Sequence, residues 1–178
     1  YGDSMKGISQ IGNLLKPENI HVFFNAPFKM DVGFGTEGFR WFEFPSNEDE
    51  FKFSQQAISQ TISEILNDIK FNIKGIFIGG FSQGGMMTLH NNYNEKVDGL
   101  IILGSQLFYE NKEFNLKKKT KIFMSHGTYD QVIPIMGSIQ TLNFLRKKGF
   151  SVDYKEYPIG HEISLDQINE LNNWIDKI

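Results

Sequence analysis

The chain of 178 residues contains no cysteine. This absence excludes disulfide bonds, zinc sites built on thiolates and a catalytic thiol. Chains without disulfides are typical of reducing compartments, so we expect a cytoplasmic protein. Long apolar runs are lacking too: none approaches the roughly 20 residues that a transmembrane helix requires. The sequence therefore predicts no membrane-spanning segment.

A large basic stretch is also lacking. The formal net charge is −3, and the nearest approach to a basic cluster is Lys117-Lys118-Lys119 with Lys121. Such a short run is more typical of a solvated loop before a strand than of a surface that follows a phosphate backbone. We therefore expect no nucleic-acid partner, and the chemistry expected below requires neither a metal nor another cofactor.

Predicted strands and helices alternate along the chain. Apolar residues at helical spacing predict a helix over residues 51–71, and an almost wholly apolar run predicts a buried strand over 73–79. Pro134 and Gly149 mark the start and stop of a further helix, and Ser164 is placed to cap the last one. The alternation predicts one α/β domain over residues 1–178, with a mainly parallel sheet and helices on both faces. The other predicted elements are strands at 21–25, 97–103, 121–125 and 152–157 and a helix at 83–93.

The stretch "GGFSQGG", residues 79–85, follows the apolar strand directly. It contains the pattern G-x-S-x-G, which in a sharp strand-to-helix turn holds the serine in strained backbone angles while glycines avoid clashes. The pattern alone also fits a flexible loop. The strand before it and the helix after it favour a nucleophile at Ser82, with the backbone N–H of Gln83 directed at an oxyanion.

Two other polar residues follow predicted strands in the same way. Asp130 lies in "HGTYDQVIP" and His161 in "PIGHEIS". Taken singly, each has an ordinary interpretation, as a turn-capping aspartate and a surface histidine. With Ser82 they give the chain order Ser, Asp, His of the α/β-hydrolase triad, which differs from the orders in chymotrypsin and subtilisin. We expect His161 to act as the base and Asp130 to fix its tautomer.

The remaining histidines are poorer candidates for the base. His126 ends its predicted strand, and we interpret it as a packed, hydrogen-bonded residue. His90 lies within the helix after the serine and His21 at the start of a predicted strand. The sequence suggests no carboxylate partner for either.

These loops resemble those of the acyl-protein thioesterase / phospholipase–carboxylesterase family of small serine α/β-hydrolases. "GGFSQGG" is close to a family signature, "SHGTYDQVIP" is similar to the acid loop, and "YPIGHEIS" is similar to the histidine loop. The resemblance runs over nearly the whole chain. It implies the α/β-hydrolase fold, the triad Ser82, Asp130 and His161, and an oxyanion-hole N–H from Gln83.

The resemblance also gives an expectation for the N-terminal stretch "YGDSMKG". It looks like the tail of the family's oxyanion loop, which implies that Tyr1 supplies the second backbone donor. In the family, the strand that feeds this loop lies inside the sheet, between the strands predicted at 21–25 and 73–79. We therefore expect an upstream segment that carries this strand, because its absence would leave two ladders unpaired.

Apolar residues at strand ends and near the glycine-rich stretch "DVGFGTEGFRWF" are candidates for an acyl-binding groove. The alternative is ordinary core packing, which we favour for Trp41 and Phe42. In "LGSQLF", residues 103–108, the small residues stand in a different order from the one the family often shows, so the preferred acyl length stays open. The candidate substrate-binding residues are Trp41, Phe42, Leu107, Ile133 and Met136.

The sequence therefore predicts a serine hydrolase that cleaves carboxylic esters or thioesters through an acyl-enzyme on Ser82. The expected partner is a small-molecule or lipid acyl ester, and an acylated protein and a homodimer are left open. The alternative is an inactive acyl-binding or scaffold protein of the same fold. A dienelactone-hydrolase-like enzyme is disfavoured, because that group generally uses a cysteine nucleophile.

Overall fold

The computed structural model describes residues 2–33, 35–45, 47–91, 93, 97–108, 116–117 and 119–178. The chain divides into two compact units, one of residues 1–54 and 163–178 and one of residues 55–162. The expectation of a single domain over residues 1–178 stays a prediction. Among the described residues, no helix is both long enough and apolar enough to cross a membrane.

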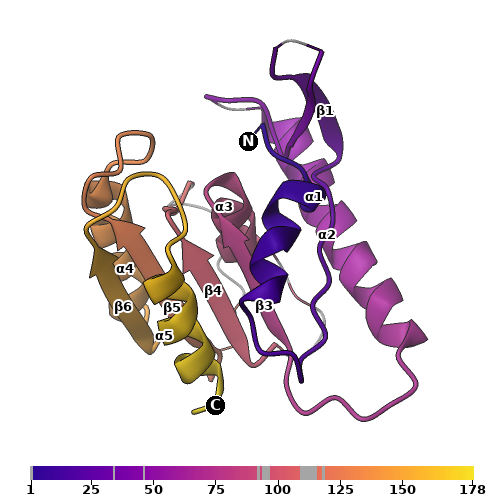
Figure 1. Cartoon of the computed structure of the whole chain (residues 1–178), viewed down its shortest axis with the longest axis vertical. Coiled ribbons are helices and arrows are strands. Elements are labelled where there is room, and N and C mark those ends of the chain that lie inside the picture. The colour runs from indigo at the N-terminus through magenta and orange to yellow at the C-terminus, as the bar shows by residue number, and fades with distance from the viewer. Residues whose placement is uncertain are drawn as a thin grey trace. The chain divides into compact units, whose positions relative to one another are not determined.

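The second unit is built on a parallel four-stranded sheet in the order β3-β4-β5-β6 (Figure 1). The expected parallel sheet of an α/β domain is confirmed in these strands. Helix α3 follows β3, and helix α4 joins β5 to β6. The bounds are β3 Phe77–Phe81, α3 Gln83–His90, β4 Gly99–Leu103, β5 Lys121–Gly127, α4 Ile135–Lys147 and β6 Val152–Tyr157.

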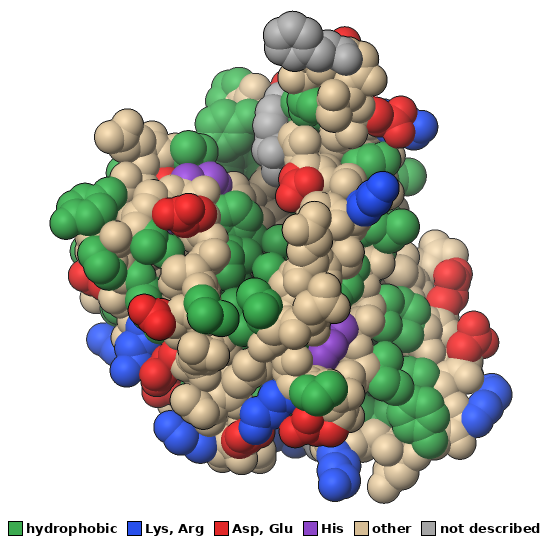
Figure 2. All heavy atoms as spheres, viewed as in Figure 1, with side chains coloured by type: hydrophobic (Ala, Val, Ile, Leu, Met, Phe, Trp, Pro, Cys, Tyr) green, Lys and Arg blue, Asp and Glu red, His purple; other side chains and the backbone are tan. Residues whose placement is uncertain are grey.

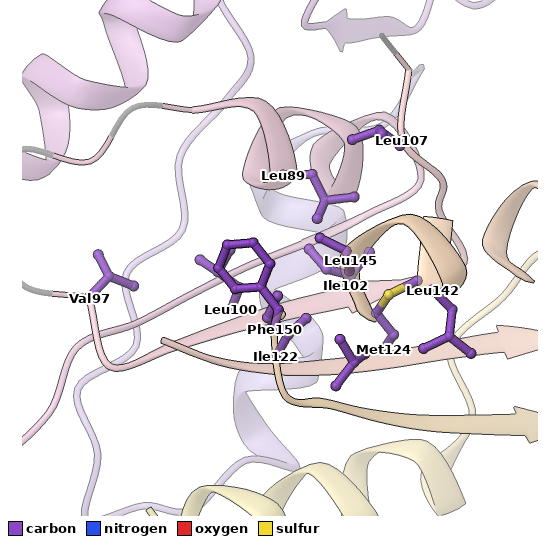
Figure 3. Packing of buried hydrophobic residues seen from close by; sticks show 11 residues of the cluster. Leu89, Val97, Leu100, Ile102, Leu107, Ile122, Met124, Leu142, Leu145 and Phe150 are labelled. Carbon is purple, nitrogen blue, oxygen red and sulfur yellow. The ribbon is translucent and has the colours of Figure 1, made fainter. Parts of the chain in front are cut away.

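One apolar cluster joins α3 and α4 to the same face of this sheet (Figure 3). Leu100 and Ile102 of β4 point to that face, because alternate residues of a strand share one side of the sheet. Leu89 of α3 and Leu145 of α4 lie against them, each about 1% exposed or less. This packing holds α3 against the sheet, and α3 begins directly after the turn at Ser82.

The first unit contains a hairpin that the sequence did not predict. Strand β1 (Phe28–Asp31) pairs antiparallel with strand β2 (Glu37–Arg40), and Gly33 and Gly35 in the turn have φ angles of 98° and 70°. Such positive φ angles suit glycine, which explains the glycine-rich composition of this stretch. The unit also holds α1 Met5–Ile8, the 3₁₀ helix η1 Ser9–Asn13 and α5 Leu165–Ile175, and α2 Glu48–Asp68 begins in it and continues into the second unit.

The helix ends agree closely with their sequence signals. Ser164 caps α5 in a full capping box with Gln167, and Gly149, with φ of 84°, follows the end of α4. The last three predicted strands are present, with β6 over the predicted residues and β5 two residues longer.

The predicted strand at 21–25 is wrong, because these residues form no strand in the structure. A strand requires a ladder partner, and among the described residues none pairs with this segment. The strand predicted from residue 73 begins only at Phe77, because the N–H of Ile76 bonds the Asp98 carboxylate at 3.1 Å instead of a neighbouring strand. The expectation of an upstream interior strand stays a prediction.

Candidate active site

The nucleophile candidate sits on a tight turn between β3 and α3. Ser82 has φ of 55° and ψ of −123°, the only positive φ outside glycine among the described residues. A Cβ placed on Gly80 would lie 2.2 Å from the carbonyl carbon of Gly84, so no side chain fits at that position. A strained serine persists only where its surroundings fix it, and such strain is common at functional sites.

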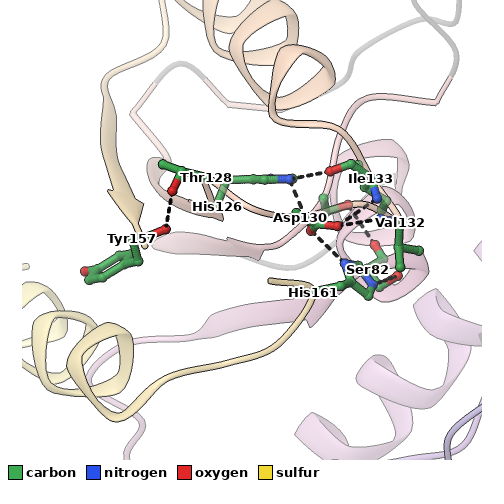
Figure 4. A network of polar contacts seen from close by, with 9 residues as sticks. Ser82, His126, Thr128, Asp130, Val132, Ile133, Tyr157 and His161 are labelled. Atoms are coloured by element: carbon green, nitrogen blue, oxygen red, sulfur yellow. Dashed lines mark hydrogen bonds and ion pairs between the residues drawn. The ribbon is translucent and has the colours of Figure 1, made fainter. Parts of the chain in front are cut away.

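A continuous hydrogen-bonded chain joins Ser82, His161 and Asp130 (Figure 4). His161 Nε2 lies 2.9 Å from Ser82 Oγ, and His161 Nδ1 lies 2.7 Å from Asp130 Oδ2. All three residues belong to the second unit. The structure therefore brings together the three side chains that the sequence singled out, although 79 residues separate Ser82 from His161.

The acid loop and the histidine loop are bonded to each other through their backbones. The N–H of Thr128 donates to the carbonyl of Tyr157 at 2.8 Å, and that of Tyr129 donates to Ile159 at 3.0 Å. A Cβ on Gly127 would lie 2.3 Å from the carbonyl oxygen of Gly160. The glycine after His126 is therefore required by the close passage of the histidine loop.

The ring of His161 is held in place from two directions. Asp130 holds Nδ1, and the ring of Phe81 lies 4.6 Å from the imidazole centroid at an angle of 36°. The side chain of His161 is 17% exposed, whereas that of Asp130 is fully buried. This arrangement leaves the imidazole partly open to a reacting molecule while its orientation is fixed.

The carboxylate of Asp130 accepts hydrogen bonds at both oxygens. Oδ1 accepts the backbone N–H groups of Val132 and Ile133, each at 2.9 Å, and Oδ2 accepts from His161. Burial raises the pKa of Asp130, but the bonds from His161, Ile133 and Val132 outweigh burial and hold that pKa below its usual range. Asp130 therefore stays ionised at neutral pH.

This lowered pKa makes part of the folding stability depend on pH. A carboxyl group with a lowered pKa in the folded state stabilises fully above its unfolded pKa of about 3.9, and that contribution is lost as the pH falls through the folded value. We expect the difference in unfolding free energy between the parent and Asp130→Asn to be constant above about pH 5 and to shrink below about pH 4. Urea denaturation across that range measures it. If the difference in unfolding free energy did not change between about pH 3 and pH 6, the pKa of Asp130 would not be lowered in the folded state.

His126 lies against the acid, a contact that the sequence did not predict. It is fully buried, as expected of a packed histidine, and its Nε2 lies 2.7 Å from the carbonyl oxygen of Ile133 and 3.3 Å from Asp130 Oδ2. Because the carbonyl can only accept, Nε2 carries the hydrogen. His126 therefore supports the acid loop, and among the described residues the imidazole that contacts Ser82 is that of His161.

The predicted substrate-binding residues fall into different environments. Phe42 is fully buried against Phe51, at 5.1 Å between ring centroids, and Leu107 belongs to the core cluster of the second unit. Both placements favour the core-packing interpretation. Ile133 is buried beside Asp130, and Met136 is 57% exposed at the start of α4.

Two further expectations concern the N-terminal part of the chain. Trp41 packs edge to face on Phe24 at 6.0 Å within the first unit. Tyr1, the expected second oxyanion donor, lies outside the described residues. Gln83, the expected first donor, is the first residue of α3. On the face drawn in Figure 2, acidic and basic side chains are interspersed. The expectation that no nucleic acid binds stays a prediction.

The parallel sheet and the hydrogen-bonded Ser82, His161 and Asp130 are arranged as expected of an α/β-hydrolase, and comparisons with known proteins give the family. A model of the phospholipase/carboxylesterase family matches residues 1–178, so the chain belongs to this family. It is 33% identical to acyl-protein thioesterase 1 of Neurospora crassa over 72% of this chain, which is 57% of that relative's length. It is 30% identical to acyl-protein thioesterase 1 of Debaryomyces hansenii, over 99% of this chain and 87% of the relative.

A solved structure supports the fold assignment. The crystal structure of SOBER1 from Arabidopsis thaliana superimposes with a TM-score of 0.83 at 25% sequence identity, over 99% of this chain and 93% of that one. SOBER1 is named a carboxylesterase, and the likeness confirms the expected α/β-hydrolase fold.

Proposed function

We propose that the protein is a serine hydrolase that cleaves carboxylic esters or thioesters through an acyl-enzyme on Ser82. The observation that carries the proposal is the chain from Ser82 Oγ through His161 to Asp130, with both contacts below 3 Å. An alcohol is a weak nucleophile at neutral pH, and an oriented imidazole is the group that can accept its proton during attack. Family membership supports the same reaction class.

In the first half-reaction, Ser82 Oγ bonds to the substrate's carbonyl carbon while its proton moves to His161 Nε2. The tetrahedral intermediate then collapses, the bond to the alcohol or thiol breaks, and His161 returns the proton to that leaving group. In the second half-reaction, His161 takes a proton from water, whose oxygen attacks the acyl carbon. Release of the carboxylic acid restores the proton to Ser82.

The developing negative charge requires hydrogen-bond donors at the carbonyl oxygen. We assign one donor to the backbone N–H of Gln83, because it follows the nucleophile directly and begins α3, where the helix dipole is positive. Tyr1 stays the proposed second donor. Asp130 remains a carboxylate throughout and stabilises the imidazolium that each half-reaction forms.

The expected substrate is an acyl ester, a lysophospholipid or an acylated protein, since all three share this chemistry. Relatives named acyl-protein thioesterase and carboxylesterase support both kinds of acyl bond. Ile133 and Met136 stay candidate contacts for the acyl chain, because both follow the acid closely in the chain and the N–H of Ile133 donates to Asp130. The proposed compartment is the cytoplasm.

A fluorophosphonate probe and p-nitrophenyl esters of increasing acyl length test the proposal. The probe labels only an activated serine, so we expect one labelled site, at Ser82, and turnover with a preferred acyl length. A folded protein that is neither labelled nor active would favour the inactive acyl-binding alternative. If Ser82 is labelled but no ester is turned over, the serine is activated and simple esters are not the substrates.

A further inference from the structure

We propose that Ser105 is a positioning residue that sets the direction of the oxyanion-hole N–H, an inference that rests on the proposed function. Ser105 follows β4 and is 1% exposed. Its hydroxyl donates to the backbone carbonyl of Ser82 at 2.7 Å. The bond therefore links the loop after one strand to the backbone of the nucleophile itself.

The carbonyl of Ser82 and the N–H of Gln83 belong to the same peptide group. A trans peptide is planar, so its C=O and N–H point in opposite directions. A hydroxyl that holds the carbonyl oxygen at one edge of the peptide group therefore helps to fix where the N–H points at the opposite edge. Ser105 acts on the oxyanion through this peptide, without touching the substrate.

Other contacts of Ser82 show that its backbone is held at both ends. Its N–H donates to the carbonyl of Leu103 at 3.0 Å, and its carbonyl also accepts from Gly85 at 3.0 Å and Met86 at 3.2 Å. These two donors are backbone N–H groups of the first turn of α3, so their bonds point along the helix axis. Ser105 is the side-chain donor to this carbonyl among the described residues, and it approaches from the neighbouring loop.

The glycines around Ser105 permit this approach. A Cβ on Gly85 would lie 2.6 Å from Ser105 Cβ and 2.7 Å from its Oγ, so the side chain lies directly on the glycine backbone. Gly104 has φ of 50°, which turns the chain after β4 and brings the next residue toward Ser82. The order Gly104-Ser105 in "LGSQLF" therefore places a hydroxyl where it can reach the turn.

Ser105→Ala tests the inference against a matched control, Thr120→Val. Thr120 is also buried, and its hydroxyl also donates to a backbone carbonyl, that of Val97 at 3.2 Å. That bond lies beside the amino ends of β4 and β5, whereas the triad lies beyond the carboxyl ends. Both variants lose one hydroxyl-to-carbonyl bond, and only Ser105→Ala changes a bond to the nucleophile's peptide.

We expect Ser105→Ala to lower kcat about tenfold with KM within about twofold, less than the 10²- to 10³-fold loss that follows removal of a whole oxyanion donor. Affinity for a short alkylboronic acid, whose boron forms a tetrahedral anionic adduct with the serine, should fall by the same factor. The pH profile should not change, because the contact between His161 and Asp130 is not altered. Thr120→Val should leave kcat and boronic acid affinity within about twofold of the parent.

Several outcomes would overturn the inference. Equal kcat values in Ser105→Ala and Thr120→Val would do so, and so would a fall in kcat without loss of boronic acid affinity. If Ser105→Ala does not fold, Ser105→Cys replaces it, and its weaker S–H donor should give an intermediate loss. A parent protein that is folded but neither labelled by fluorophosphonate nor active would overturn the proposed function, and this inference with it.

Discussion

Ser82→Ala should lower kcat by about 10⁶-fold, by analogy with removal of the nucleophile in subtilisin. The expected loss is large because the remaining groups have nothing to form an acyl-enzyme with. The alanine keeps the Cβ of the strained residue, and the serine hydroxyl makes no capping bond to α3. The fold should therefore be retained, and steady-state hydrolysis of a p-nitrophenyl ester measures the loss.

Ser138→Ala is a suitable control for this variant. Ser138 is a buried serine on α4, in the same unit but outside the triad. Its replacement should change kcat little, while both variants should melt close to the parent temperature. A loss of only about tenfold in a folded Ser82→Ala protein would show that Ser82 is not the nucleophile.

Asp130→Asn should lower kcat by about 10⁴-fold, because it reverses the tautomer of His161. The amide oxygen of the asparagine must face the N–H groups of Val132 and Ile133, which only donate. Its NH₂ group then faces His161 Nδ1, so that nitrogen must accept and Nε2 carries the hydrogen. An Nε2–H directed at Ser82 cannot take the serine proton.

Asp68→Asn makes the same chemical change at an exposed aspartate at the end of α2. It should leave kcat within about twofold of the parent. If Asp130→Asn kept more than about a tenth of the parent kcat while folded, the tautomer argument and the acid role of Asp130 would both be wrong.

Much of the parallel sheet could be predicted because its signals are local. A strand covered on both sides is apolar along its length, as β4 is. Strand β6 is mostly polar, and the turn residues that follow it mark its end. The three triad residues could be named for the same reason: each follows the end of a strand, and parallel strands bring those ends to one edge.

The errors concern features that depend on partners elsewhere in the chain. Residues 21–25 have the composition of a strand, but composition does not supply a ladder partner. The β1–β2 hairpin was missed because the glycine-rich turn between its two short strands interrupts the apolar pattern. Ser105 could not be assigned from sequence, because its contact with the Ser82 carbonyl depends on the three-dimensional path of the loop.

The parallel sheet also determines how strongly the acid loop and the histidine loop resist local unfolding. Strand β5, which carries His126 and leads to Asp130, is bonded to β4 on one side and β6 on the other, and six of its seven residues are buried. Amide hydrogens in such a strand exchange with solvent chiefly through global unfolding. His161 instead follows β6, an edge strand of the described sheet with only two fully or partly buried positions beyond Val152. On warming, the histidine loop should therefore loosen before the acid loop. His161 would then lose its orientation while most amide hydrogens of the sheet remain protected from exchange.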